Sequence, residues 1–547
     1  MSSTSSTIAP EELSSPGSVL DVVLIRAVAV FGALTALCLL IIPKFFLPAE
    51  DAVILFQFSR NLALNGAITY VPFGPHAEGA TDFAWMVLLS AGIKLGIDPF
   101  WLIAAINFIS LILLAVLLLK IAGRKITPLP ALFIMGAFAL MPQIFAGIAG
   151  FSSLPFAVLL VLLTFCFLRQ DDVAMPVVGL VLCLFRPDGV VFAVPMLIAA
   201  LLVYPKAVRR AALDVALFVA PGLLYFAWRW HYFGQMLPLP FLVKSSAQRF
   251  AHLFVLTSVG EGILLLLFTL ILLWFVLGGR LGGRLSELPN RAVLVCIVLL
   301  PNIFYFAMRL DQNIGRRFFI YLPVGAAILI AMNWQSIRPR AGFLLRLGLV
   351  AWIFLVAFSW IDAAKNFWAS QFDNRKAIAM DLDKLPHGVM IATEAGILPY
   401  YSHWTAYDPW GLNTATFATR LFQPSDVAAI HPDLVMVYTT GDIECTPQAS
   451  WQTPYTERTW RHLTRNIVTG ADPAQYELWM LPMGSARNRA LHHRNSWQGD
   501  QECWFVRRDS PLRSSLEGIL SSHGGSPADR YRQLVSSQGS SGASGGQ

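Results

Sequence analysis

Residues 101–119 read WLIAAINFISLILLAVLLL, a run without a charged side chain. A helix of about twenty apolar residues crosses the hydrocarbon core of a bilayer. A water-soluble chain cannot bury many such runs, so the sequence predicts a polytopic α-helical membrane protein with about eleven transmembrane helices. The other expected spans are residues 19–42, 127–146, 154–168, 174–187, 189–204, 211–229, 255–278, 292–308, 317–333 and 343–361.

The composition of the 547-residue chain agrees with this prediction. Hydrophobic residues make up 56% of it and charged residues only 13%, with a mean hydropathy of +0.59. Soluble domains contain about 45–50% apolar and about 25% charged residues, so an ordinary soluble enzyme is excluded. The net charge of +7 is typical of a membrane protein with basic cytoplasmic loops. Because no basic groove with interleaved aromatic residues is found, no nucleic-acid partner is expected.

The basic loops indicate the orientation. Residues 1–17 are Ser-rich and lack the basic start of a signal peptide, so the run at 19–42 is expected to remain as an uncleaved helix. The short run at 83–95 is either a further span or a helix at the membrane interface. The interfacial interpretation puts the basic loops at 120–125, 206–210, 280–291 and 338–340 on the cytoplasmic side. The loop 47–98 and everything after residue 360 then lie outside.

The chain changes character after residue 361, where the predicted membrane domain (18–361) ends. Charged residues return over 362–520 with β-like runs at 389–393, 434–439 and 476–481, which predicts a soluble α/β domain outside the membrane. Disorder is expected over 1–17 and over the Ser- and Gly-rich 521–547.

Cys445 and Cys503 lie in the predicted soluble domain and can form a disulfide in an oxidising compartment, but their spacing leaves the pairing open. Since no metal-binding motif occurs, no cofactor is expected, and a divalent-metal requirement stays open.

Two acidic segments fall in the first outer loop. Glu50 and Asp51 follow the first span and begin a segment with Leu and Phe on one helical face and Gln and Arg on another, as in an interfacial helix. Asp51 either caps this helix or acts as a general base at the membrane surface. The Gly- and Pro-rich stretch 72–85 carries His76, Glu78 and Asp82; it is either a plain loop or a binding site for sugar hydroxyls.

Further charges fall at membrane depth or at the outer face, where ionisable residues are functional candidates. Arg186 and Asp188 flank a Pro in a tight turn, either as an internal ion pair or as part of a site. Lys244, Arg316 and Arg317 lie in outer loops, where they either extend toward the interface or bind an anion such as a lipid phosphate. Carboxylates and cations at one membrane face suit glycosyl transfer from a lipid-linked phosphate to a hydroxyl acceptor.

Five segments of the chain match the pattern of a known family, in the same order. With them the chain resembles the GT-C superfamily of polyprenyl-phosphate-dependent glycosyltransferases, most closely the subgroup of bacterial terminal β-(1→2)-arabinofuranosyltransferases. The segments are residues 50–85 (DDAFISFRYARNLxxGxGxxxNPGExxEGYTxFLW), 186–189 (RPDG), 232–244 (YYGxxLPNxFxxK), 317–323 (RFxxPxxP) and 396–413 (GAIPYYSG…DxLGLND), each with the family pattern in parentheses.

The resemblance implies an inverting glycosyltransferase of the bacterial cytoplasmic membrane, with Asp51 as the catalytic base and Glu50 beside it. Its donor would be a polyprenyl-phosphate-linked sugar, arabinofuranose by kinship, and its acceptor a cell-envelope glycan or a glycoprotein bound by the outer domain. The chain differs from the pattern at Glu50, where Asp is usual, and at Gln57, which replaces an Arg. The family element GLETP reads GFSSL at 150–154, without its carboxylate. The sugar and the acceptor therefore stay open.

The implied site residues divide by role. Glu78 and Asp82 would help to shape the sugar site. Lys244, Arg316 and Arg317 would bind the lipid phosphate, and Arg186 with Asp188 would support the pocket.

Two other functions compete with glycosyl transfer. A transporter or flippase of lipid-linked sugars would place its site at the bilayer midplane in repeated halves, and the chain has no internal repeat. A non-catalytic envelope protein on the same scaffold is the other alternative, suggested by the missing GLETP carboxylate.

Overall fold

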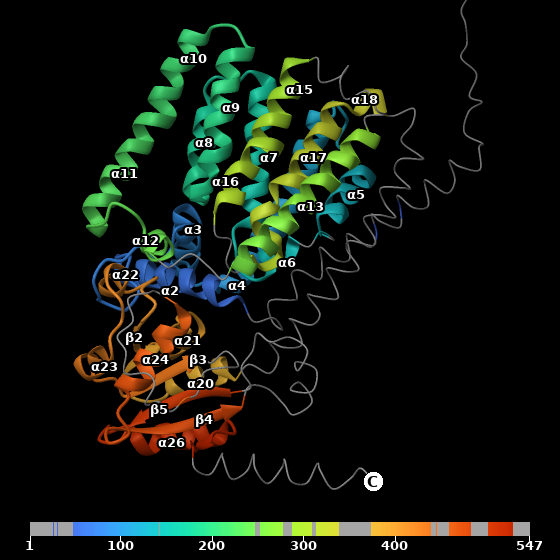
Figure 1. The fold of residues 1–547 in the computed structure, drawn as a ribbon. Coiled ribbons are helices and arrows are strands. Elements are labelled where there is room, and N and C mark those ends of the chain that lie inside the picture. Colours follow the sequence, from blue (N-terminus) through green and yellow to red (C-terminus); the bar gives the residue numbers. More distant parts are fainter. Residues whose placement is uncertain are drawn as a thin grey trace, which may run out of the picture. The chain divides into compact units, whose positions relative to one another are not determined.

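The computed structural model divides the chain into two compact units, each assembled from separate stretches (Figure 1). The first contains Met1–Phe45, Ile103–Pro221 and Leu253–Ala363, and the second contains Phe46–Leu102, Gly222–His252 and Ala364–Gln547. The expected spans at 19–42 and 343–361 fall outside the residues that the structure describes, apart from two positions. The described residues are 26, 30, 48–139, 141, 143–246, 252–276, 287–308, 313–337, 374–438, 445, 459–482 and 501–528.

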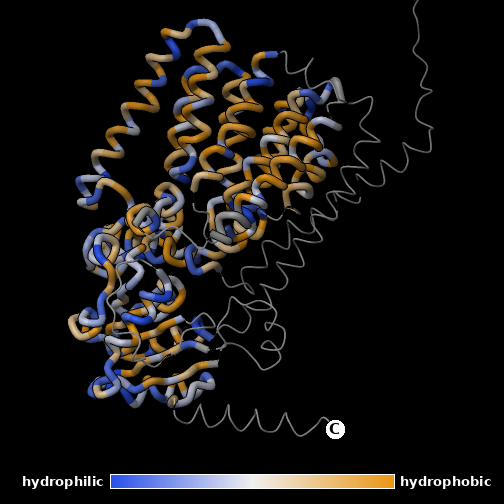
Figure 2. Tube along the Cα trace, in the orientation of Figure 1, coloured by the Kyte–Doolittle hydropathy of each residue, from blue (hydrophilic) through white to orange (hydrophobic). Residues whose placement is uncertain are grey.

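The first unit is helical, and its helices are apolar along most of their length (Figure 2). Fully buried aromatic side chains such as Phe156, Phe192 and Tyr321 pack at its centre. Its elements are α4 (Pro99–Ile121), which starts in the second unit, α5 (Pro128–Ala139), α6 (Ile144–Ile148), α7 (Ser153–Arg169), α8 (Ala174–Phe185), η2 (Pro187–Gly189), α9 (Val190–Val203), α10 (Ala207–Asp214), η3 (Val215–Val219), α13 (His252–Val276), α15 (Leu288–Val293), η4 (Leu294–Leu299), α16 (Leu300–Ala307), η5 (Ile314–Phe319), α17 (Tyr321–Met332) and α18 (Trp334–Ile337).

Four helices of the described chain are long and apolar enough to cross a membrane, judged by length and composition. They are Pro99–Ile121, Ala207–Phe233, Leu288–Ala307 and Ile314–Met332. Most of the other expected spans within the described chain form shorter apolar helices. The total of about eleven transmembrane helices therefore stays a prediction.

The second unit begins with α2 (Glu50–Asn65) and α3 (Phe83–Lys94) and includes α12 (Leu239–Ser246) and all of α11 (Ala220–Phe233) except its first two residues. α3 has only 12 residues, too few to cross a bilayer, which agrees with the interfacial interpretation of this run. The segment 50–65 forms a helix, but it is not the expected interfacial helix with one apolar and one polar face. Every side chain from Ala52 to Asn61 is buried, because the polar face of α2 also has partners: Gln57 and Asn61 donate to the main-chain oxygen of Tyr70.

A six-stranded mixed sheet forms the C-terminal part of this unit, in the order β2-β1-β3-β5-β4-β6. The three expected strands are confirmed as β1 (Val389–Ala392), β3 (Leu434–Tyr438) and β4 (Tyr476–Pro482). β1 is parallel to β2 and β3, whereas β5 is antiparallel to β3 and β4. The remaining elements are β2 (Thr405–Tyr407), β5 (Gln501–Arg507), β6 (Ser526–Pro527), α20 (Arg375–Leu382), α21 (Ile397–Ser402), α22 (Ala415–Thr419), α23 (Pro424–Ile430), α24 (Trp460–Gly470) and α26 (Arg513–Ser522).

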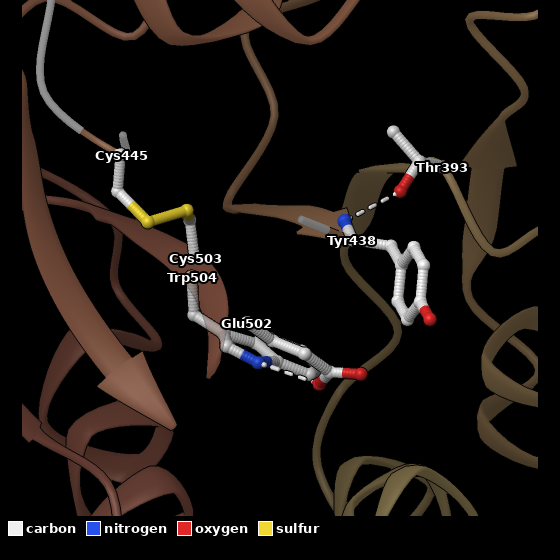
Figure 3. The surroundings of a disulfide bond; sticks show 6 residues. All are labelled: Thr393, Tyr438, Cys445, Glu502, Cys503 and Trp504. Carbon is white, nitrogen blue, oxygen red and sulfur yellow. Dashed lines mark hydrogen bonds between the residues drawn. A yellow bond between two sulfur atoms is a disulfide. The ribbon is translucent and has the colours of Figure 1, made fainter. Parts of the chain in front are cut away.

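Cys445 and Cys503 form a disulfide, which answers the question that their spacing left open (Figure 3). Their Cα atoms are 5.7 Å apart. Cys503 lies on the central strand β5, where it is opposite Val437 of β3 and Met480 of β4. The disulfide thus joins residue 445 to the middle of the sheet.

Candidate functional site

The N-terminus of α2 is joined to the segment that follows β1. Glu50 Oε2 accepts a hydrogen bond of 2.6 Å from the main-chain N–H of Ile397, and Oε1 lies 3.4 Å from a guanidinium nitrogen of Arg375. Arg375 also pairs with Glu394 at 2.8 Å. A Cβ on Gly396 would overlap the main-chain and carboxylate oxygens of Glu50, so only glycine allows this approach. Glu50 therefore binds two residues that lie far along the sequence, Arg375 and Ile397.

Asp51 occupies the first turn of α2 and is partly exposed. Asp51 is not the N-cap residue of α2, as one of the two alternatives expected. That position is occupied by Ala49, which makes no side-chain cap hydrogen bond. A carboxylate in a first helical turn interacts favourably with the helix dipole. Asp51 thus lies at the end of a buried helix, directly beside the Glu50 contact.

Glu78 is buried and paired with a cation that the sequence analysis did not single out. Its Oε1 lies 2.9 Å from Nε of Arg229 on α11, and both side chains are almost inaccessible to solvent. Burial raises the pKa of Glu78 to about 7, and the nearby Arg229 opposes this shift. Oε2 of Glu78 has no hydrogen-bond partner among the described residues. The main-chain oxygen of Glu78 accepts a hydrogen bond of 3.1 Å from Leu239, the first residue of α12.

The loop 72–82 also touches the segment 408–413 in the C-terminal part of the second unit. Gly79 packs against Asn413, and a Cβ at position 79 would overlap the Asn413 side chain and approach the oxygen of Leu412. Asp408 holds this segment in place by accepting hydrogen bonds of 2.9 Å from the main-chain N–H groups of Trp410 and Asn413. Burial raises the pKa of Asp408 to about 6, against the effect of these donors. Two of the resembling segments thus meet here.

Aromatic contacts bring a third resembling segment to the same loop. His76 stacks on Tyr232 with ring centroids 4.0 Å apart, and Trp228 stacks on the same ring at 5.2 Å. The Tyr232 hydroxyl accepts a hydrogen bond of 3.0 Å from the N–H of Ile68. Asp82, the N-cap residue of α3, accepts a hydrogen bond of 3.4 Å from the Thr81 hydroxyl. The segments 72–85, 232–244 and 396–413 therefore form one assembly in the second unit.

Lys244 lies on α12, and its side chain is exposed. It forms no ion pair with any residue in the described part of the chain. A flexible ammonium group in this setting can approach an anion from solvent or from a membrane surface.

The remaining expected residues come together in the first unit, around Phe318. Arg186 donates to both oxygens of Asp188 at 3.0 and 2.6 Å, and the Tyr305 hydroxyl donates to Asp188 at 2.5 Å. The guanidinium carbon of Arg186 lies 5.3 Å from the centre of the Phe318 ring, and that of Arg317 lies 4.9 Å from it. The internal ion pair considered for Arg186 and Asp188 is thus present in this unit.

Arg316 and Arg317 point to different partners. Arg316 has a left-handed backbone, with φ of 54°, and pairs with Glu261 at 3.5 Å. The guanidinium group of Arg317 lies over the ring of Phe151 at 3.8 Å. Phe151 belongs to the segment GFSSL, which stands where the family has GLETP. An aromatic contact to a cation thus occurs in the segment that lacks the family's carboxylate.

The expected site residues therefore form two sets, one in each unit. Glu50, Asp51, Glu78, Asp82 and Lys244 belong to the second unit. Arg186, Asp188, Arg316 and Arg317 belong to the first. Within the described residues, no group of three or more His, Cys, Asp or Glu side chains is placed to hold a metal ion.

Sequence reasoning missed the partners that hold these residues. Arg229 gave a usable signal, because it is the charged residue that ends the apolar run 211–229. Arg375 and Asp408 gave none, since their importance depends on contacts with residues far away in the sequence or on a particular loop conformation. Tyr305 was hidden inside an expected span, where an aromatic residue is ordinary.

Comparisons with known proteins give a domain match and several structural similarities. Residues 368–493 match a domain of unknown function, DUF8728. No curated protein matches the chain. Among solved structures, ArnT from Cupriavidus metallidurans in the apo state is similar with 15% identity and a TM-score of 0.49, over 77% of this chain and 93% of ArnT.

Two further solved structures are similar. The oligosaccharyltransferase of Archaeoglobus fulgidus, in complex with zinc and sulfate, gives 15% identity and a TM-score of 0.46 over 84% of this chain and 72% of its own. ArnT from Cupriavidus metallidurans bound to undecaprenyl phosphate gives 14% identity and a TM-score of 0.39 over 90% of this chain and 98% of ArnT.

Proposed function

We propose that the chain is an inverting glycosyltransferase that moves a sugar from a polyprenyl-phosphate donor to an acceptor of the cell envelope, at the outer face of the cytoplasmic membrane. One observation carries the proposal. Three separate segments that match the family pattern, 72–85, 232–244 and 396–413, pack together, and the last of them is hydrogen-bonded to Glu50, the residue next to Asp51. Random matches to a pattern would have no reason to meet in one assembly.

In the proposed reaction Asp51 accepts the proton of the acceptor hydroxyl. The hydroxyl oxygen forms a bond to the anomeric carbon of the sugar, while the bond from that carbon to the donor phosphate breaks. The polyprenyl phosphate leaves with the electron pair, and the attack from the opposite side inverts the anomeric configuration. Lys244, in the same unit as Asp51, is the cation proposed to stabilise the departing phosphate. For Arg316 and Arg317, which belong to the other unit, a role in phosphate binding rests on the resemblance alone.

The other candidates have supporting roles in this proposal. Glu50 holds the N-terminus of α2 through Ile397 and Arg375, so it would position Asp51 in addition to lying beside it. Glu78 and Asp82 lie in the loop proposed to shape the sugar site, and the pair of Arg186 and Asp188 supports the helical unit. Arabinofuranose as the sugar, and a wall glycan or a glycoprotein as the acceptor, are the finer parts of the proposal and rest on the resemblance.

The outer location has a supporting observation of its own. The disulfide between Cys445 and Cys503 is stable in an oxidising compartment and rare in the cytoplasm. A catalytic assembly in the same unit as this disulfide would therefore act on the outer side, where envelope acceptors are located.

Asp51→Asn tests the proposal. The amide retains the shape of the side chain but cannot take a proton, so transfer from a radiolabelled polyprenyl-phosphate sugar should fall by about 10²- to 10⁴-fold in proteoliposomes. Folding should be nearly unchanged. Asp509→Asn is a matched control, because this carboxylate of the same unit is 74% exposed.

The outcomes separate the competing functions. Transfer by Asp51→Asn at nearly the wild-type rate would refute the role of Asp51. Movement of the lipid-linked sugar across the vesicle membrane without transfer would indicate the transporter, and neither activity in the wild type would indicate a non-catalytic protein.

A further inference from the structure

Arg229 is a buried arginine whose donors all point to the protein itself. The residue is 5% exposed and lies near the end of α11. Its Nε faces Glu78 at 2.9 Å, and both terminal nitrogens donate to the main-chain oxygen of Met236, at 3.0 and 2.9 Å. A lysine could not reproduce this pattern, because its single ammonium group lacks the rigid fork of a guanidinium.

These contacts fix the turn that leads to α12. Met236 lies between the end of α11 and Leu239, where α12 begins. Leu239 in turn donates to the main-chain oxygen of Glu78. The side chain of Glu78 thus holds Arg229, which holds the turn, and the main chain of Glu78 holds the first residue of α12. Lys244 lies on this short helix, about one and a half turns further on.

We propose that Arg229 is a positioning residue for the donor phosphate: together with Glu78 it sets the place of α12 and so of Lys244. The inference rests on the proposed function, in which Lys244 binds the phosphate. Arg229 does not bind the phosphate itself, because it is buried and its guanidinium is already hydrogen-bonded to Met236 and paired with Glu78. Lys244, by contrast, is exposed.

The test must avoid a variant that simply fails to fold. Removing one partner of a buried ion pair leaves an uncompensated charge, whereas removing both is much less damaging. We therefore choose the pair Arg229→Gln/Glu78→Gln, which removes both charges and also the fork on Met236. The matched control is Arg513→Gln/Glu517→Gln, which removes another arginine–carboxylate pair from the same unit, on α26. Thermal unfolding in detergent confirms that each full-length variant is folded.

The measurement is binding of farnesyl phosphate to the purified full-length protein, with farnesol as the ligand without phosphate. We expect Lys244→Gln and Arg229→Gln/Glu78→Gln each to weaken farnesyl phosphate binding by about tenfold, equivalent to about 1.4 kcal/mol. The triple variant should bind no more weakly than Lys244→Gln, because residues that act through one another are not additive. The control pair should bind like the wild type. In the transfer assay kcat/KM for the donor should fall by about tenfold in both variants, because Lys244 is proposed to act on the departing phosphate.

The failures of the two proposals differ. If the double variant binds like the wild type while Lys244→Gln does not, or if the losses add in full, the positioning role is overturned and the proposed function stands. If the wild type binds farnesyl phosphate no better than farnesol, the proposed function fails and the inference fails with it.

Discussion

Gly79 is the residue at which the packing of the site leaves least room. A Cβ there would overlap the side chain of Asn413 and come within 2.8 Å of the main-chain oxygen of Leu412. Gly79→Ala should therefore push the loop 72–82 away from the segment 408–413, at a cost of about 1–3 kcal/mol. The lower melting temperature of the purified protein in detergent would report this loss, together with reduced transfer.

The control for this substitution is Gly518→Ala, in the middle of α26. A Cβ at position 518 meets no other atom within 4 Å, so the replacement should be neutral or slightly stabilising. Equal melting temperatures for the two variants would show that the close contact at Gly79 does not exist.

At this scale the sequence identified charged residues but not their partners. Glu78 and Lys244 stood out because ionisable residues expected at membrane depth or at its outer face are functional candidates. Their link through Arg229 could not be predicted, because it depends on how the turn at 234–238 folds back onto α11. Gly79 could be recognised as part of a pattern, but the reason for glycine there required the position of Asn413.

The first turn of α2 contains two adjacent carboxylates with different surroundings. Glu50→Ala should destabilise the protein by about 2 kcal/mol, because it leaves the N–H of Ile397 without its acceptor and removes a partner of Arg375. Asp51→Asn should leave stability almost unchanged. Chemical denaturation of the two variants in detergent, followed by tryptophan fluorescence, measures the difference. If Glu50→Ala is as stable as the wild type, Glu50 does not stabilise the fold, and only its proposed role in the reaction remains.

The hydrophobic periodicity of α2 predicts a helix but does not predict its surroundings. Its helical pattern was readable, and a helix forms from Glu50 to Asn65. The pattern could not distinguish a helix at a membrane surface from one buried on all sides, because a polar face can meet either water or protein acceptors. Here Arg60 donates to the main-chain oxygen of Tyr400, so the polar face is turned toward protein. By contrast, β1 and β3 were predictable because short apolar runs between turns are typical of buried strands.

The two units of the whole molecule are discontinuous in sequence. Composition separates an apolar stretch from a polar one, and so it predicts linear domains such as 18–361 and 362–520. It cannot indicate that residues 46–102 and 222–252 belong to the same compact unit as the C-terminal sheet, because that depends on contacts such as those of Gly79 and His76 with residues far along the chain.

The orientation of the second unit can be tested through its disulfide. In a variant whose other four cysteines are serine, we expect no labelling of intact cells by a membrane-impermeant maleimide, because Cys445 and Cys503 are joined. After prolonged treatment with a membrane-impermeant phosphine, both should be labelled slowly, because the two buried cysteines become accessible only when the unit opens locally and the reagents reach only the outer side. Cys445→Ser/Cys503→Ser is the unlabelled control. Labelling that needs permeabilised cells but no reductant would place this unit in the cytoplasm, where thiols stay reduced, and would remove the access to envelope acceptors that the proposed transferase needs.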